Sequence, residues 1–159
     1  MHPRLARALL ASSPEGETAY IDADLRDTGA ILAQAARILD FGQPVAVMLL
    51  GVLHCIPDSG DPAAIVARLV DAVAPGSYLT IAHPASDVAT DQMAASMRKY
   101  NEHVAVPLTA RSHDEVSAFF AGLDLVEPGL VQLHRWRAGT GDPGTGRELA
   151  NYGGLGRKP

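Results

Sequence analysis

The chain has 159 residues, of which 47% are hydrophobic and 19% charged, and these proportions indicate one globular domain rather than a disordered segment. The formal net charge of -5 argues against nucleic acid as a partner, because phosphate binding needs a basic surface. No apolar run is long enough to cross a membrane, and a single cysteine, Cys55, excludes an internal disulfide, so we expect a cytoplasmic protein without a membrane partner.

The first part of the chain alternates helical and extended patterns. Residues 4–11 have a helical pattern and residues 18–22 an extended one. Asp27 or Thr28 can cap a helix that continues to about Leu39, because both side chains accept hydrogen bonds from a first helical turn.

The segment 45–52 is an apolar run without alternation, which is typical of a strand buried on both faces in a parallel sheet. Ligands of open α/β sheets bind beyond the carboxyl ends of such strands, so His54 is a candidate site residue. The alternative is a histidine that only ties down a turn through hydrogen bonds. Cys55 beside it is more typical of a small buried hydrophobic residue than of a nucleophile.

Helices and strands continue to the end of the chain. Asp61 can cap a helix with Pro62 in its first turn, and Ser112 with Glu115 forms a capping box at the start of a later helix. Pro128-Gly129 predicts a hairpin turn. The remaining predictions are a helix at 91–101, strands at 78–83, 125–126, 129–137 and 148–153, and a Gly-rich loop at 138–146. This order predicts an α/β sheet with parallel strands first and an antiparallel end.

Four segments, taken in order, carry a resemblance to a known family. They are YIDADLRD at 20–27, LHCIPD at 53–58, APGSYL at 74–79 and YGGLGRKP at 152–159. With them the chain resembles S-adenosylmethionine-dependent methyltransferases of the Rossmann-like type, and more narrowly a bacterial family of methyltransferase-like proteins.

Members of that family have a further N-terminal half, with the first strand, a Gly-rich turn under the methionine part of the cofactor, and the second strand. The resemblance therefore implies that residues 1–159 form a single, N-terminally truncated Rossmann-like methyltransferase domain. It keeps the third, fourth and fifth strands and an antiparallel C-terminal hairpin.

The resemblance implies a cofactor role for two groups of residues. Asp24 and Leu25 follow the third strand, where such proteins hold adenine with an acidic side chain and a backbone N–H. Leu50, Gly51 and Val52 end the fourth strand, where backbone carbonyls approach the amino group of S-adenosylmethionine. Asp24 has a second interpretation, since aspartate also caps helices.

The resemblance places two histidines near the transferred methyl group. His54 follows the fourth strand and His83 ends the fifth, and either is a candidate substrate contact or general base, because histidine accepts protons near neutral pH. The histidines elsewhere have no metal-ligand spacing, so we predict no metal site.

We expect two consequences if the chain lacks the N-terminal half of the family. Without the Gly-rich turn, we expect weak or absent binding of S-adenosylmethionine. Without the first two strands, the strand at 45–52 keeps an unpaired edge, which is a template for pairing. The segment at 18–22 then pairs with that edge, or two chains join there as a homodimer, or the chain is a fragment that does not fold stably alone.

Three functions follow from this interpretation. The first is a methyltransferase-family protein that acts on an unknown small molecule. The second is a non-catalytic remnant that pairs with itself or with a full-length relative. The third is a domain that binds or cyclises a small molecule without the cofactor.

Overall fold

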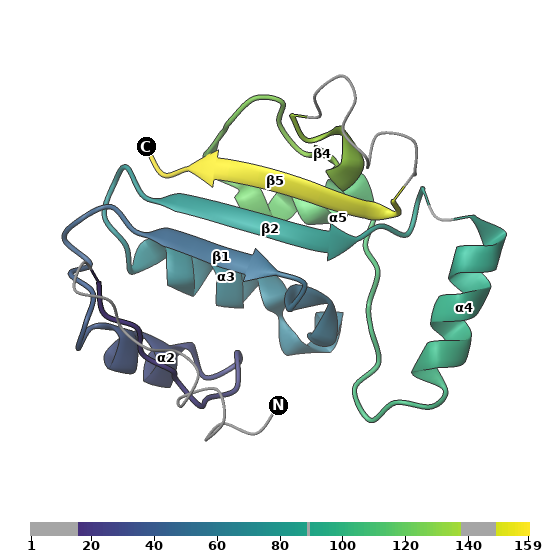
Figure 1. The fold of residues 1–159 in the computed structure, drawn as a ribbon, viewed down its shortest axis with the longest axis horizontal. Coiled ribbons are helices and arrows are strands. Elements are labelled where there is room, and N and C mark those ends of the chain that lie inside the picture. Colours follow the sequence, from purple (N-terminus) through teal and green to yellow (C-terminus); the bar gives the residue numbers. More distant parts are fainter. Residues whose placement is uncertain (1–15, 89, 138–148) are drawn as a thin grey trace.

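The computed structural model describes residues 16–88, 90–137 and 149–159, and a five-stranded mixed sheet lies at their centre (Figure 1). The strands are β1 (Ala46–Leu50), β2 (Tyr78–Pro84), β3 (Asp124–Leu125), β4 (Val131–Gln132) and β5 (Asn151–Arg157). β1 and β2 are parallel, β2 and β5 are antiparallel, and β3 and β4 each pair antiparallel with β5. This arrangement confirms the predicted α/β sheet with an antiparallel end. The helix predicted at 4–11 and the loop predicted at 138–146 lie outside the described residues.

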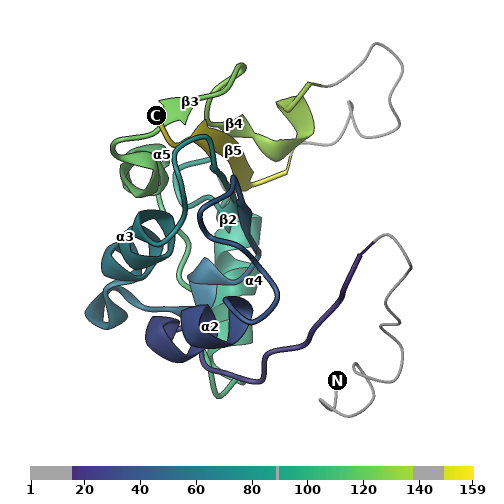
Figure 2. The same cartoon turned by 90° about the vertical axis from the view of Figure 1, so that its left-hand side faces the viewer.

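Two of the described helices pack on one face of this sheet. The helices are α2 (Thr28–Ala35), α3 (Pro62–Asp71), α4 (Asp91–Asn101) and α5 (His113–Ser117). α3 and α5 cover the same face, whereas α4 stands beside the carboxyl end of β2 (Figures 1 and 2). The core lies between the sheet and α3 and α5, and it includes Ile65, Val66, Leu69, Leu79, Ile81, Val116, Phe119 and Phe120.

Capping side chains start the helices at the predicted positions. Asp27 and Asp61 each accept a hydrogen bond of 3.0 Å from the backbone N–H three residues later. Ser112 and Glu115 complete the predicted capping box. α2 and α5 end earlier than the apolar patterns predicted, and a 3-10 turn over Ala118–Phe120 follows α5.

The strand predicted at 18–22 is wrong, because residues 17–24 belong to neither a helix nor a strand. A strand needs a neighbour whose backbone groups complement its own. Within the described chain β1 pairs only with β2, so its outer edge is not taken by residues 18–22. This excludes one of the three outcomes expected for that edge.

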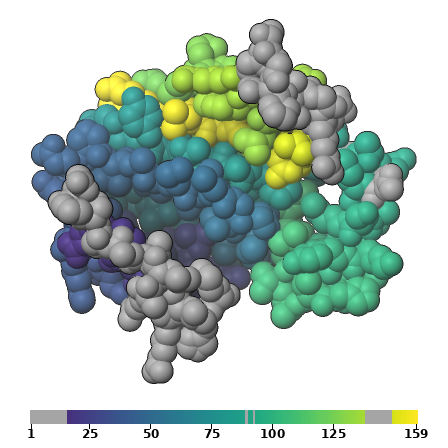
Figure 3. Space-filling model, viewed as in Figure 1, coloured from purple at the N-terminus to yellow at the C-terminus, as the bar shows by residue number. Residues whose placement is uncertain are grey.

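The expectation that β1 is buried on both faces is also wrong. Leu49 points into the core and Val47 packs against it, whereas the alternate side chains of Met48 and Leu50 are 60% and 49% exposed. The physical reason is that no α-helix of the described chain covers the second face of the sheet over β1 (Figure 1), and this face is drawn in Figure 3. Among the described residues, β1 is therefore an edge strand with one open face.

The hairpin predicted around Pro128-Gly129 is wrong in its pairing. β3 and β4 both pair with β5 rather than with each other. The last strand was predicted at 148–153, but β5 extends to Arg157 and lies inside the sheet, next to β2. Its glycines make this position possible, because Phe120 and Leu130 occupy the space that a side chain at Gly154 would need.

Candidate functional site

Gly51 ends β1 and turns the chain at the carboxyl edge of the sheet. Its φ of +66° lies in the left-handed region that favours glycine, and its N–H donates to the carbonyl of Ala82 on β2 at 3.1 Å. A 3-10 turn over Leu53–Cys55 follows directly. This turn places His54 at the edge where open α/β sheets bind their ligands.

His54 has one ring nitrogen without a hydrogen-bond partner. Its Nδ1 is shielded from solvent and unpaired, while its backbone carbonyl accepts a hydrogen bond from the N–H of Thr109 at 2.8 Å. Burial lowers the pKa of His54 below its usual value, and the Arg111 guanidinium acts in the same direction. At neutral pH the ring is therefore mostly uncharged, so one of its two nitrogens carries a lone pair.

His83 lies 6.3 Å from His54, measured between ring centroids, but it is fully buried. Its Nδ1–H donates to the carbonyl of Pro84 at 2.9 Å, and its Nε2 accepts from Nη1 of Arg111 at 2.9 Å. Burial is the main reason why the pKa of His83 is lowered to about 4; the hydrogen bond to Pro84 opposes this shift and the Arg111 charge adds to it. Both ring nitrogens are engaged, so the packing favours a structural role, and the catalytic role of His83 stays a prediction.

Arg111 connects the turn after β1 to the end of β2 through its hydrogen bonds, and the sequence did not predict this role. Its side chain is 3% exposed and lies 5.6 Å from the ring of Phe119. Nη2 donates to the carbonyl of Ile56 and to the carboxylate of Asp58, each at 2.8 Å. The partners lie more than fifty positions earlier in the chain, so no local pattern could reveal them. Arg111 thereby fixes the loop that contains His54.

The residues predicted at the adenine end lie apart from this network. The carboxylate of Asp24 pairs with Arg26 at 2.9 Å and is 56% exposed. Leu25 packs against the core. The side chain of Arg26 reaches toward Gly60, just before α3. Asp24 is thus available to a ligand only in competition with Arg26.

The cofactor residues predicted at the end of β1 are accessible. Leu50 and Val52 are 49% and 40% exposed, and Gly51 turns between them. The structure thus brings Leu50, Gly51, Val52 and His54 to one edge, with His83 buried behind it. Their roles toward a cofactor stay predictions.

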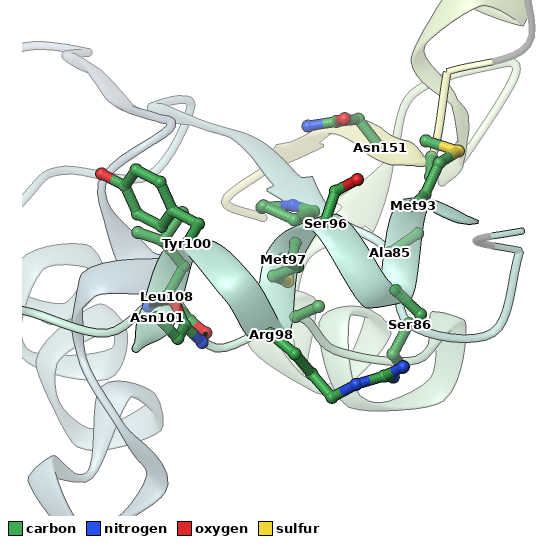
Figure 4. Close-up of a pocket in the computed structure, with 14 residues that line it drawn as sticks. Ala85, Ser86, Met93, Ser96, Met97, Arg98, Tyr100, Asn101, Leu108 and Asn151 are labelled. Atoms are coloured by element: carbon green, nitrogen blue, oxygen red, sulfur yellow. Dashed lines mark hydrogen bonds between the residues drawn. The ribbon is translucent and has the colours of Figure 1, made fainter. Parts of the chain in front are cut away.

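A cavity of about 670 Å³ lies beyond the carboxyl end of β2 (Figure 4). Pro84, Ala85 and Ser86 form one side, and α4 forms the other through Met93 and Met97. Gly51, His54 and His83 do not line this cavity. The loop after α4 nonetheless connects the cavity to His54. Leu108 and Ala110 of this loop line the cavity, and the backbone N–H of Thr109 between them donates to the carbonyl of His54.

Comparison with models of known protein families identifies the family of this chain. A family model described as S-adenosyl methyltransferase matches residues 2–159. The chain belongs to the S-adenosyl methyltransferase family. This agrees with the resemblance found in the sequence. None of the curated proteins matches the chain significantly.

Solved structures agree with this family. A DUF574 family protein from Streptomyces avermitilis is 38% identical, has a TM-score of 0.89, and is matched over 98% of this chain and 61% of its own. A candidate methyltransferase from Thermobifida fusca is 35% identical, with a TM-score of 0.81 and coverage of 98% and 58%. This methyltransferase-family chain thus spans less than two thirds of the length of either relative.

A more distant structure shares only the fold. An O-methyltransferase family protein from Burkholderia thailandensis is 15% identical, has a TM-score of 0.54, and is matched over 87% of this chain and 35% of its own. The fold is therefore the Rossmann-like methyltransferase sheet that the sequence predicted.

Two further features were searched for in the part of the chain that the structure describes. There, no three side chains of the kinds that bind metals gather into a possible ion site. The described helices are also too short or too polar to span a membrane.

Proposed function

We propose that this chain contributes to methyl transfer from S-adenosylmethionine to a small molecule in the cytoplasm. The observation that supports it most is the family match over residues 2–159, combined with a sheet edge at which an uncharged histidine lies. The cofactor supplies a methyl group on a positively charged sulfur. His54 would accept the proton that an acceptor hydroxyl or amine loses.

The described residues fit only part of this cofactor. Asp24 offers a carboxylate for the adenine amino group, although Arg26 competes for it. The carbonyl groups near Gly51 offer acceptors for the methionine amino group. No Gly-rich turn lies among the described residues to surround the methionine part, so these residues do not hold the whole molecule. Binding by this chain alone should therefore be weak or absent.

Titration of the purified chain with S-adenosylmethionine tests the expected weak binding of the cofactor. We expect isothermal titration calorimetry to give a millimolar dissociation constant or no measurable heat, because the described residues include no Gly-rich turn for the methionine part. Any residual binding should weaken in Asp24→Asn, which removes the charge but keeps the shape, and should not change in Asp40→Asn as a matched control. A micromolar dissociation constant for the unmodified chain would contradict the expected weak binding.

A second candidate function is self-association through β1. Its outer edge is unpaired within the described chain, and Met48, Leu50 and Val52 are 60%, 49% and 40% exposed beside it. An unpaired apolar edge favours pairing with another strand, and two identical edges can join antiparallel about a two-fold axis. This supports the non-catalytic alternative, a homodimer built across β1.

Sedimentation velocity tests the homodimer. We expect a dimer for the unmodified chain and a shift to monomer in Met48→Lys, which would place two like charges near each other across the joined edges. Val106→Lys is the matched control, because Val106 is 51% exposed but lies in the loop after α4. A well-folded monomer at every concentration would show that the β1 edge does not pair.

A further inference from the structure

Hydrogen bonds organise each side of the cavity beside α4. On the sheet side, the N–H of Ala85 donates to the carbonyl of Ala150 at 2.8 Å, which joins the ends of β2 and β5. On the helix side, the amide of Asn101 donates to the carbonyl of Leu108 and accepts from its N–H, both at 2.9 Å. These bonds fasten α4 to the loop that follows it. A cavity that exists before the ligand arrives costs less to occupy.

The cavity is apolar with one charge at its side. Met93, Met97 and Leu108 line it together with several alanines. Among the described residues that line it, Arg98 alone carries a charge, and its side chain extends from α4 toward Ser86 in the view of Figure 4. Its volume of about 670 Å³ lies within the range of pockets that hold small organic ligands.

The side chains of this cavity select a particular chemistry. Methionine adapts its shape and makes favourable contacts between its sulfur and aromatic rings. Arginine presents a planar fork of N–H donors that matches a carboxylate. We propose that the cavity binds an aromatic carboxylate, with the ring against Met93 and Met97 and the carboxylate on Arg98. That this molecule is also the methyl acceptor rests on the proposed function, whereas its binding does not.

Two probes of the same shape test the charge preference. The full chain, without S-adenosylmethionine, is titrated with 2-naphthoate and with the uncharged 2-naphthamide. We expect naphthoate to bind about tenfold more tightly, which corresponds to one charge-assisted hydrogen-bonded pair at a partly exposed site. Arg98→Gln should remove the preference, and Lys99→Gln, the adjacent exposed residue on α4, should keep it.

A third variant tests the location. Ala94→Trp fills the cavity from α4 and should abolish binding of both probes while circular dichroism stays unchanged. Equal affinities for the two probes, no binding of naphthoate, or unchanged binding in Ala94→Trp would each overturn the proposal. The S-adenosylmethionine titration is independent of this test. Weak or absent binding of S-adenosylmethionine is the expected result and leaves the carboxylate site in place, whereas loss of naphthoate binding would reject the carboxylate site and leave the proposed function untouched.

Discussion

Replacing Gly154 with alanine is expected to lower the free energy of unfolding by about 2 kcal/mol, as overpacking of a filled core does. A Cβ atom at this position would lie 2.8 Å from Cζ of Phe120 and 3.1 Å from Cδ1 of Leu130. Phe120 is 3% exposed, so its ring has little room to move away. At this chain length such a loss lowers the melting temperature by about 4–8 °C.

The neighbouring glycine gives a matched control. A Cβ at Gly153 would lie 2.7 Å from Cδ1 of Leu133, which is the end of a flexible side chain that is 40% exposed. Leu133 can rotate away, and alanine suits a strand interior better than glycine by about 0.5–1 kcal/mol. We therefore expect Gly153→Ala to change the free energy of unfolding by less than about 1 kcal/mol. Urea unfolding of both variants checks the pair, and equal losses would show that the ring of Phe120 does not limit this strand.

The same strand shows where sequence patterns reach their limit. The segment from Asn151 to Arg157 holds three glycines, which strands generally avoid, and its sequence predicted only a short strand that ended at 153. In the fold this segment pairs with three other strands. Bulky side chains from other parts of the chain pack against its glycines and fill the space that larger residues would occupy. Strand propensity describes a residue and its neighbours in sequence. It therefore cannot predict that Phe120, from another element, packs against the glycines of this strand.

The apolar run at 45–52 was interpreted correctly as a strand and wrongly as buried on both faces. Hydrophobicity reports which surfaces can be buried, but not whether a covering element is present in the chain. The parallel sheet followed from local residues, since an unbroken apolar run is typical of parallel strands, and β1 does pair parallel with β2. The exposure of Met48 depends on what covers the second face, which the described chain does not supply.

In the candidate site, too, one residue could be predicted from a local pattern and another could not. His54 was predicted as a site residue from its place after an apolar strand, and the fold places it at the carboxyl end of β1, while its role stays a prediction. Arg111 has no such signal, because an arginine before a helix cap is usually a surface residue. Its role depends on the turn at 53–58 and on His83 meeting it in three dimensions. Buried charged networks of this kind become visible only when distant segments are brought together.

Lowering the pH from 7 to 4.5 is expected to destabilise the chain by about 2 kcal/mol through His83 alone, since each unit of pKa shift corresponds to about 1.4 kcal/mol. Burial lowers the pKa of His83 in the folded chain to about 4, from 6.5 in the unfolded chain. The unfolded chain therefore binds the proton first as pH falls through 6.5. The stabilising contribution is complete above this value and is lost progressively toward pH 4. His54, whose pKa is also lowered, acts in the same direction.

Burial is the main cause of this lowered pKa, and a proton on Nε2 of His83 would in addition meet the N–H of Arg111 at 2.9 Å. His83→Gln removes the titration and keeps an acceptor for that N–H, so its urea-unfolding free energy should depend on pH less steeply than that of the unmodified chain by about 2 kcal/mol over this range. His103→Gln, at an exposed position after α4, is the control and should retain the full dependence. Hydrogen bonds from Ser112 lower the pKa of Glu115, which adds the same acid sensitivity to the unmodified chain and to His83→Gln and therefore cancels when the two chains are compared. If His83→Gln and the unmodified chain showed the same pH dependence, His83 would have to be protonated as easily in the folded chain as in the unfolded one, and the buried pair with Arg111 would not hold in solution.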